Sequence, residues 1–265
     1  MGKKANRLWL SLAFVLLMCL VACGQTQQEG SAENNEKSEG KSGMDILIDQ
    51  QGIERPSEDT VNVLKGKRAL FVGDSIMAGV CDYNTIFGGN GWPSRIGYFC
   101  DMTVTNNGVS GACISNIKET ENSDYYIYNQ LNKEAGQDYD YVIMHGLHND
   151  WGNGAKIGIP EGKSNFQPEN ADVSTFSGAL EMLFYTAKEH HPSAKYGYII
   201  NYKTGEQLTY VDTIKQICGD WDVPYLNLYE NREFQIDLED GLHPTSKGYN
   251  DTYMVIADWM ADITE

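Results

Sequence analysis

The chain has 265 residues and a formal net charge of −17 at pH 7, from 37 acidic and 20 basic side chains. This charge argues against nucleic acid or an anionic membrane surface as a partner, because both repel an acidic protein. The length suits one domain of ordinary size with short flanking segments.

The first 22 residues are typical of an export signal. Three basic residues precede an apolar run over residues 8–21, which is too short for a membrane span. The run ends in Leu20-Val21-Ala22-Cys23, which resembles the lipobox of bacterial lipoproteins. That resemblance implies cleavage before Cys23 and attachment of lipid to its thiol. We therefore expect an exported protein, anchored to the outer face of the cell membrane through this lipid alone; an uncleaved anchor and a simple secreted protein are the alternatives.

Residues 23–60 are predicted to form a flexible linker. Residues 24–43 contain almost no large apolar side chain, so they cannot bury enough surface to become ordered. Residues 44–50, MDILIDQ, could instead form a short strand or a docking segment. The folded domain is expected over residues 61–265.

Five apolar runs in this domain alternate with helix-like segments. The predicted strands cover residues 68–73, 103–111, 139–146, 195–202 and 223–229. Apolar residues at helical spacing predict helices over residues 92–100, 123–135, 173–191, 205–221 and 246–263, the last capped by Ser246. The alternation predicts a five-stranded parallel sheet with helices on both faces.

Polar blocks follow these strands, where parallel sheets place their ligand sites. Ser75 follows the first strand, Gly108-Val109-Ser110-Gly111 the second, and His148-Asn149-Asp150 the third. Residues 240–243 lie in the loop after the fifth strand. We expect all four blocks to gather at one edge of the sheet.

The residue types in these blocks suit acyl transfer. Ser75 would be a nucleophile if a base removed its proton, and His243, with Asp240 three residues before it, is the candidate base. Developing negative charge needs donors, which the Ser75 N–H, the Gly111 N–H and the Asn149 amide could supply. Each residue alone could equally be a turn or capping residue, and no Gly-x-Ser-x-Gly elbow is present.

Together, the ordered blocks resemble the SGNH, or GDSL-like, hydrolase family. They read Gly73-Asp74-Ser75-Ile76, Asn107-Gly108-Val109-Ser110-Gly111, Asn149-Asp150 and Asp240-Gly241-Leu242-His243-Pro244. The resemblance implies a flavodoxin-like three-layer α/β/α sandwich that needs no metal and no other cofactor. It also implies Ser75 as nucleophile and His243 as base, oriented by Asp240, with Ser75 N–H, Gly111 and Asn149 as the oxyanion hole.

The third block departs from the family pattern. The family usually has Gly-x-Asn-Asp, whereas this chain has Leu147 in the position of the glycine. The loop then either carries an extra residue or accepts a side chain beside the oxyanion hole. The pose of Asn149 stays open at this point.

Other residues near the blocks allow several interpretations. His145-x-x-His148 with Asp150 could bind a metal, but two histidines three apart at such a junction seldom converge on one ion, so a core role for His145 is favoured. Trp92, Trp151 and His148 could form the substrate rim, or the tryptophans could belong to the core. A disulfide between Cys81 and Cys113 would brace the site; free buried thiols are the alternative.

The sequence therefore predicts a cell-surface, lipid-anchored serine esterase. The expected substrate is a small-molecule or glycan ester, most simply an O-acetylated carbohydrate. A lysophospholipase or short-chain lipase is the alternative enzyme. A glycan-binding lipoprotein that keeps the fold without the chemistry is the alternative from another class.

Overall fold

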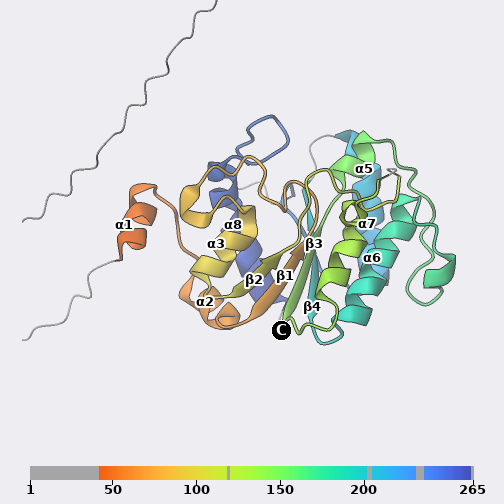
Figure 1. Cartoon of the computed structure of the whole chain (residues 1–265), viewed down its shortest axis with the longest axis horizontal. Coiled ribbons are helices and arrows are strands. Elements are labelled where there is room, and N and C mark those ends of the chain that lie inside the picture. Colours follow the sequence, from red (N-terminus) through yellow and green to blue (C-terminus); the bar gives the residue numbers. More distant parts are fainter. Residues whose placement is uncertain (1–41, 118–119, 202–204, 231–235, 264–265) are drawn as a thin grey trace, which may run out of the picture. The chain divides into compact units, whose positions relative to one another are not determined.

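The computed structural model describes residues 42–117, 120–201, 205–230 and 236–263, and Figure 1 shows their arrangement. They belong to one compact unit, Lys41–Glu265. The predicted signal peptide and Cys23 lie outside the described residues. Among the helices described, none is long and apolar enough to cross a membrane.

The sheet has five parallel strands, as predicted. They are β1 (Arg68–Val72), β2 (Thr103–Asn106), β3 (Tyr141–His145), β4 (Lys195–Ile200) and β5 (Tyr225–Asn227), in the order β2-β1-β3-β4-β5. This is the flavodoxin-like order. The strands are shorter than the apolar runs; the second stops at Asn106 because residues 107–111 already form the loop that carries a polar block.

Helices cover both faces of the sheet, which completes the predicted three-layer α/β/α sandwich (Figure 1). Alternation along β1 separates the faces: Leu70 and Val72 join one apolar core, and Ala69 and Phe71 join the other. The first core is covered by α4 (Ile127–Gln130), α6 (Phe176–His190) and α7 (Leu208–Asp220). The second is covered by α2 (Glu58–Leu64), α3 (Gly91–Phe99) and α8 (Ser246–Asp262).

The compact unit begins before residue 61, the predicted boundary. Residues 43–50 form neither strand nor linker but the helix α1 (Gly43–Gln50), whose N-terminus is capped by the Ser42 side chain. Ile48 and Ile53 are buried in the core beneath α3 and α8. The burial of these few apolar side chains orders a segment whose polar neighbours in the sequence indicate a flexible linker.

Two helix predictions also differ in detail. Thr245, not Ser246, caps α8, because its Oγ1 accepts a hydrogen bond from the Gly248 N–H at 3.1 Å. The predicted helix over residues 123–135 is broken into α4 and two flanking 3-10 turns. A further α-helix, α5 (His148–Gly152), is short and begins in the third polar block.

Candidate active site

The turn after β1 displays Ser75. A Cβ on Gly73 would lie 2.8 Å from the His145 carbonyl oxygen, so only glycine fits where β1 ends beside β3. Asp74 then closes the turn, because its Oδ1 accepts a hydrogen bond from the Ile76 N–H at 2.9 Å. Ser75 is left at the carboxyl edge of the sheet with only 6% of its surface exposed.

His243 bridges Ser75 and Asp240. Its Nε2 lies 2.8 Å from the Ser75 Oγ, and its Nδ1 lies 2.8 Å from the Asp240 Oδ2. The other carboxylate oxygen of Asp240 accepts backbone N–H groups of Leu242 and His243, both at 2.9 Å. The backbone and side-chain hydrogen bonds of His243 hold the pKa of the Asp240 carboxyl well below its ordinary value.

This geometry determines which way the proton can move. An ionised Asp240 can only accept, so the His243 Nδ1 carries a hydrogen and Nε2 is left with a lone pair. That lone pair faces the Ser75 hydroxyl. The arrangement suits removal of the serine proton and stabilisation of the resulting imidazolium.

The second and third blocks meet beside this turn. The Val109 N–H donates to the Gly73 carbonyl at 3.0 Å, which joins the β2 loop to the serine turn. Gly111 has a φ of 83°, a conformation that L side chains rarely adopt. The Asn149 Nδ2 donates to the Ala112 carbonyl at 2.8 Å, so the third block is joined to the second.

Asp150 fixes the relative position of these two loops. It is fully buried and accepts hydrogen bonds from the backbone N–H groups of Ile114, at 2.9 Å, and Ser115, at 2.8 Å. The Ser115 hydroxyl donates to it as well. Burial nevertheless raises the pKa of Asp150 to about 6, because the donors are neutral.

The departure at Leu147 carries backbone strain. Leu147 has a φ of 153° and a ψ of −48°, a region suited to the glycine of the family pattern. Its side chain is 1% exposed and packs in the core beneath α6 and α7. The loop therefore accepts the side chain by turning it into the core, and Asn149 keeps its hydrogen bond to Ala112.

His145, the last residue of β3, and His148, the first residue of the third block, are both buried. The His145 Nδ1 lies 2.9 Å from the Ile199 carbonyl, and its Nε2 faces Asp74 Oδ1 at 3.5 Å. The His148 Nδ1 lies 3.1 Å from the Gln207 Nε2, and burial lowers the pKa of His148 to about 4. Within the described residues these histidines do not form a metal-binding group with Asp150.

The predicted substrate rim needs correction. Trp92 is fully buried, and its indole N–H donates to Thr252 Oγ1 at 2.7 Å, so it belongs to the core between α3 and α8. His148 is also buried, and Trp151 is half-buried. The aromatic side chain that stands exposed near the triad is Tyr83, at 73%. Burial thus assigns most of the predicted rim to the interior.

The predicted disulfide does not form. None of Cys81, Cys100, Cys113 and Cys218 forms a disulfide in the structure. Cys113 is fully buried, which matches the alternative of a buried thiol, whereas Cys81 is partly exposed. The loops around the site are therefore held by hydrogen bonds.

Sequence reasoning did not identify Gln130 as part of the site. Its side chain accepts from the Gly73 N–H at 2.8 Å and donates to the Gly73 carbonyl at 2.9 Å. It also donates to the Asp124 carbonyl at 3.0 Å. This buried amide fixes the backbone just before Ser75. The sequence shows only that Gln130 lies in a helix-like segment. It does not show the contact with Gly73, which is 57 positions away.

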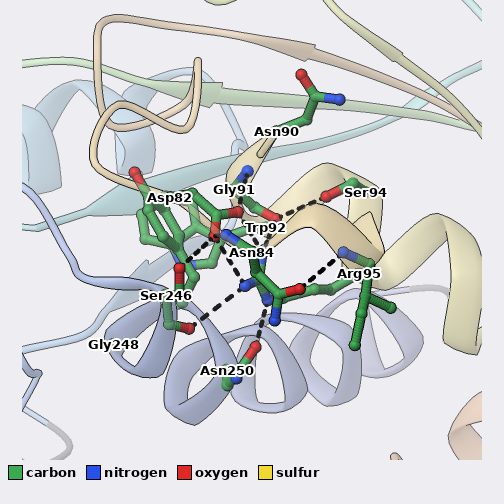
Figure 2. A network of polar contacts seen from close by, with 12 residues as sticks. Asp82, Asn84, Asn90, Gly91, Trp92, Ser94, Arg95, Ser246, Gly248 and Asn250 are labelled. Atoms are coloured by element: carbon green, nitrogen blue, oxygen red, sulfur yellow. Dashed lines mark hydrogen bonds and ion pairs between the residues drawn. The ribbon is translucent and has the colours of Figure 1, made fainter. Parts of the chain in front are cut away.

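A second unpredicted feature is a buried ion pair between Asp82 and Arg95, both fully buried (Figure 2). The Arg95 guanidinium donates to the two Asp82 oxygens at 2.6 and 3.1 Å and to the Asn250 Oδ1 at 2.6 Å. Asp82 also accepts the Gly91 N–H at 3.0 Å and the Ser246 hydroxyl at 2.9 Å.

This network links the two sequence segments that carry the triad. Asp82 lies in the loop that follows the Ser75 turn, and Ser246 begins α8, three residues after His243. Figure 2 shows the ion pair between α3 and the first turns of α8. The Tyr249 hydroxyl adds a direct bond by donating to the Ile76 carbonyl at 2.9 Å. The distance between serine and histidine is therefore set by buried contacts.

The parallel sheet has a serine, a histidine and an aspartate joined by hydrogen bonds at its carboxyl edge. This combination defines a serine hydrolase. The model of the GDSL-like lipase/acylhydrolase family matches residues 71–250. The chain belongs to this family and is an esterase of the GDSL-like, or SGNH, type.

Several solved structures share the fold. A Bacteroides ovatus protein assigned as a GDSL-like lipase has a TM-score of 0.60 and 19% identity, over 75% of this chain and 99% of its own. Est24, a carbohydrate acetylesterase from Sinorhizobium meliloti, has a TM-score of 0.52 and 14% identity, over 74% and 99%. Among curated proteins, no sequence matches this chain.

Proposed function

We propose that this esterase removes acyl groups, chiefly O-acetyl groups, from a carbohydrate. The observation that carries its chemistry is the continuous hydrogen-bonded series from Ser75 through His243 to Asp240, with both linking distances at 2.8 Å. This series lies at the carboxyl edge of the sheet, where open α/β folds bind their ligands.

The first half of the reaction forms an acyl-enzyme. The Ser75 Oγ attacks the ester carbonyl carbon while its proton passes to the His243 Nε2. The imidazolium keeps its Nδ1–H on the ionised Asp240, which stabilises the new positive charge. When the intermediate collapses, Nε2 gives its proton to the departing alcohol oxygen. Water then repeats these steps against the acyl-serine, and the acid leaves.

The oxyanion forms between the two loops joined by Asn149. The donors are the backbone N–H groups of Ser75 and Gly111 and the side-chain amide of Asn149. An amide nitrogen has two hydrogens. One binds the Ala112 carbonyl and thereby orients the group; the other serves the oxyanion.

Three features support a carbohydrate as the alcohol. The acidic chain, at −17, is not drawn to anionic phospholipid or anionic polymer. Tyr83, exposed at 73%, offers an aromatic face on which a sugar ring can stack. A carbohydrate acetylesterase is among the proteins that share the fold, which makes this substrate class the first to test.

The test is hydrolysis of p-nitrophenyl acetate, butyrate and octanoate by the purified chain, followed by acetate release from an O-acetylated glycan. We expect turnover to be fastest on acetate and to vanish in Ser75→Ala. Ser174→Ala, which changes an exposed serine before α6, is the matched control and should keep full activity. Octanoate preference together with fatty-acid release from a lysophospholipid would replace the deacetylase proposal by the lipase alternative.

We also propose that Cys23 carries the lipid that holds the enzyme at the outer face of the cell membrane. The support is the Leu20-Val21-Ala22-Cys23 sequence after the apolar run. Metabolic labelling with an alkyne fatty acid should mark the wild-type chain and not Cys23→Ala. Equal labelling of both would exclude this attachment site.

A further inference from the structure

Cys81 lies next to the histidine and the aspartate of the triad. One ligand atom from each of Cys81, Asp240 and His243 lies within 4.8 Å of the other two. In the described parts of the chain, this is the only group of three or more potential metal ligands found so close together. Neither the fold nor the esterase mechanism requires a thiol at this position.

The donor set suits a thiophilic divalent cation. Zn²⁺ binds thiolate sulfur at about 2.3 Å, imidazole nitrogen at about 2.0–2.1 Å and carboxylate oxygen at about 2.0–2.2 Å, in tetrahedral geometry. Two ligands of one such ion are roughly 3–4 Å apart. The three side chains therefore need only small adjustments to share it. Mg²⁺ and Ca²⁺ prefer oxygen ligands, so the thiol and imidazole select against them.

The cluster is open to ions from solvent. The Asp240 side chain is 51% exposed and that of His243 is 15% exposed, while Cys81 is partly exposed. The neighbourhood is also acidic, because Glu239 directly precedes Asp240 in the same loop. A cation arriving here meets negative charge, and a tetrahedral ion held by three side chains takes water as its fourth ligand.

We propose that Cys81, Asp240 and His243 form an inhibitory binding site for a thiophilic divalent cation, with Zn²⁺ as the probe. On binding, Cys81 releases its thiol proton to solvent and becomes the thiolate ligand. If the ion takes the His243 Nδ1, the single imidazole proton moves to Nε2, which then cannot accept from Ser75. If it takes Nε2, the ion occupies the lone pair itself. In either binding mode His243 can no longer accept the Ser75 proton, and no bond to substrate is involved.

The inference concerns regulation of the site in the proposed function, so its test combines activity with metal spectroscopy. The full chain is titrated with Zn²⁺ during p-nitrophenyl acetate hydrolysis, with Mg²⁺ in parallel. We expect Zn²⁺ to inhibit the wild type and Cys81→Ser to raise the inhibitory concentration at least about tenfold, because a thiolate ligand is lost. Basal activity of Cys81→Ser should stay unchanged. Cys100→Ala, which removes a fully buried thiol, should remain inhibited like the wild type.

Co²⁺ gives a readout that needs no turnover. Bound through a thiolate, it should produce a near-ultraviolet charge-transfer band in the wild type and in Cys100→Ala, and none in Cys81→Ser. Equal Zn²⁺ inhibition of wild type and Cys81→Ser, or absence of the band from the wild type, would overturn the proposal. A Cys81-dependent band in a chain without turnover would support the cation site and count against the proposed esterase function instead.

Discussion

The two halves of the active site are held in different ways. The charged half, which carries Ser75 and His243, is tied to α3 and α8 by the Asp82–Arg95 pair, in which a buried carboxylate is neutralised by a guanidinium. The neutral half, which carries the proposed oxyanion donors, is tied together by Asp150, a buried carboxylate that accepts hydrogen bonds from neutral N–H and O–H groups. We infer that proton transfer is supported by fixed charge, and the proposed oxyanion binding by backbone geometry.

Breaking the ion pair of the charged half should cost the most stability. Arg95→Met leaves the Asp82 carboxylate buried without a counter-ion and should lower the free energy of unfolding by about 3–5 kcal/mol. Urea denaturation measures this. Adding Asp82→Asn removes the orphaned charge but keeps an acceptor for the Gly91 N–H, so the double variant should recover a large part of the loss. If the free energy of unfolding of Arg95→Met lay within about 1 kcal/mol of the wild-type value, this account would be contradicted.

Breaking the neutral half should reduce activity more than stability. Asn149→Ala removes one oxyanion donor and should lower kcat by about 100- to 1000-fold. Its hydrogen bond to Ala112 is half-buried, so the free energy of unfolding should fall by only about 0.5–1.5 kcal/mol.

The matched control for this prediction is Asn153→Ala. Asn153 is exposed and donates to the Asn149 carbonyl from the next turn, so it touches the loop without supplying a donor to the oxyanion. Steady-state kinetics should show near wild-type kcat for Asn153→Ala. A comparable loss in both variants would mean that the loop, and not the Asn149 amide, is what matters.

Leu147 tests how far backbone geometry limits the stability of the neutral half. Leu147→Ala removes apolar burial and keeps a Cβ in a conformation with φ of 153°. Leu147→Gly removes more side chain but relieves strain of about 1–3 kcal/mol. Leu147→Gly should therefore unfold at higher urea than Leu147→Ala, although glycine usually destabilises more. The opposite order would show that the backbone here is not strained.

The fold and the triad were accessible from sequence because their signals are local. Apolar runs alternating with helical spacing predicted the sheet, and Asp240 and His243 are only three residues apart. The supports were not accessible, since they join distant residues: Ser246 reaches Asp82 across 164 positions. The interpretation of Trp92 as a substrate-rim residue was wrong for a related reason, because its burial depends on a helix that is distant in the sequence. Its neighbours along the chain are polar and glycine-rich, and only the packing of α8 against α3 shows that it is buried.

Within the neutral half, two buried groups should make the free energy of unfolding change with pH in opposite directions. The pKa of Asp150 is raised from 3.8 to about 6, so between these values the folded state holds more protons and stability falls as pH rises. The pKa of His148 is lowered from 6.5 to about 4, so over nearly the same range the unfolded state holds more protons and stability rises with pH. The two contributions largely cancel in the wild type.

Single substitutions should expose each slope. Relative to wild type, His148→Gln should lose stability between pH 4 and 6, whereas Asp150→Asn should gain it, each by no more than about 1 kcal/mol per pH unit. Urea midpoints at half-unit intervals of pH measure the difference. Slopes of the same sign in the two variants would mean that the buried carboxyl and imidazole do not titrate independently. The oxyanion loops would then share one proton, and the neutral half would contain a coupled acid–base pair, unlike the fixed ion pair of the other half.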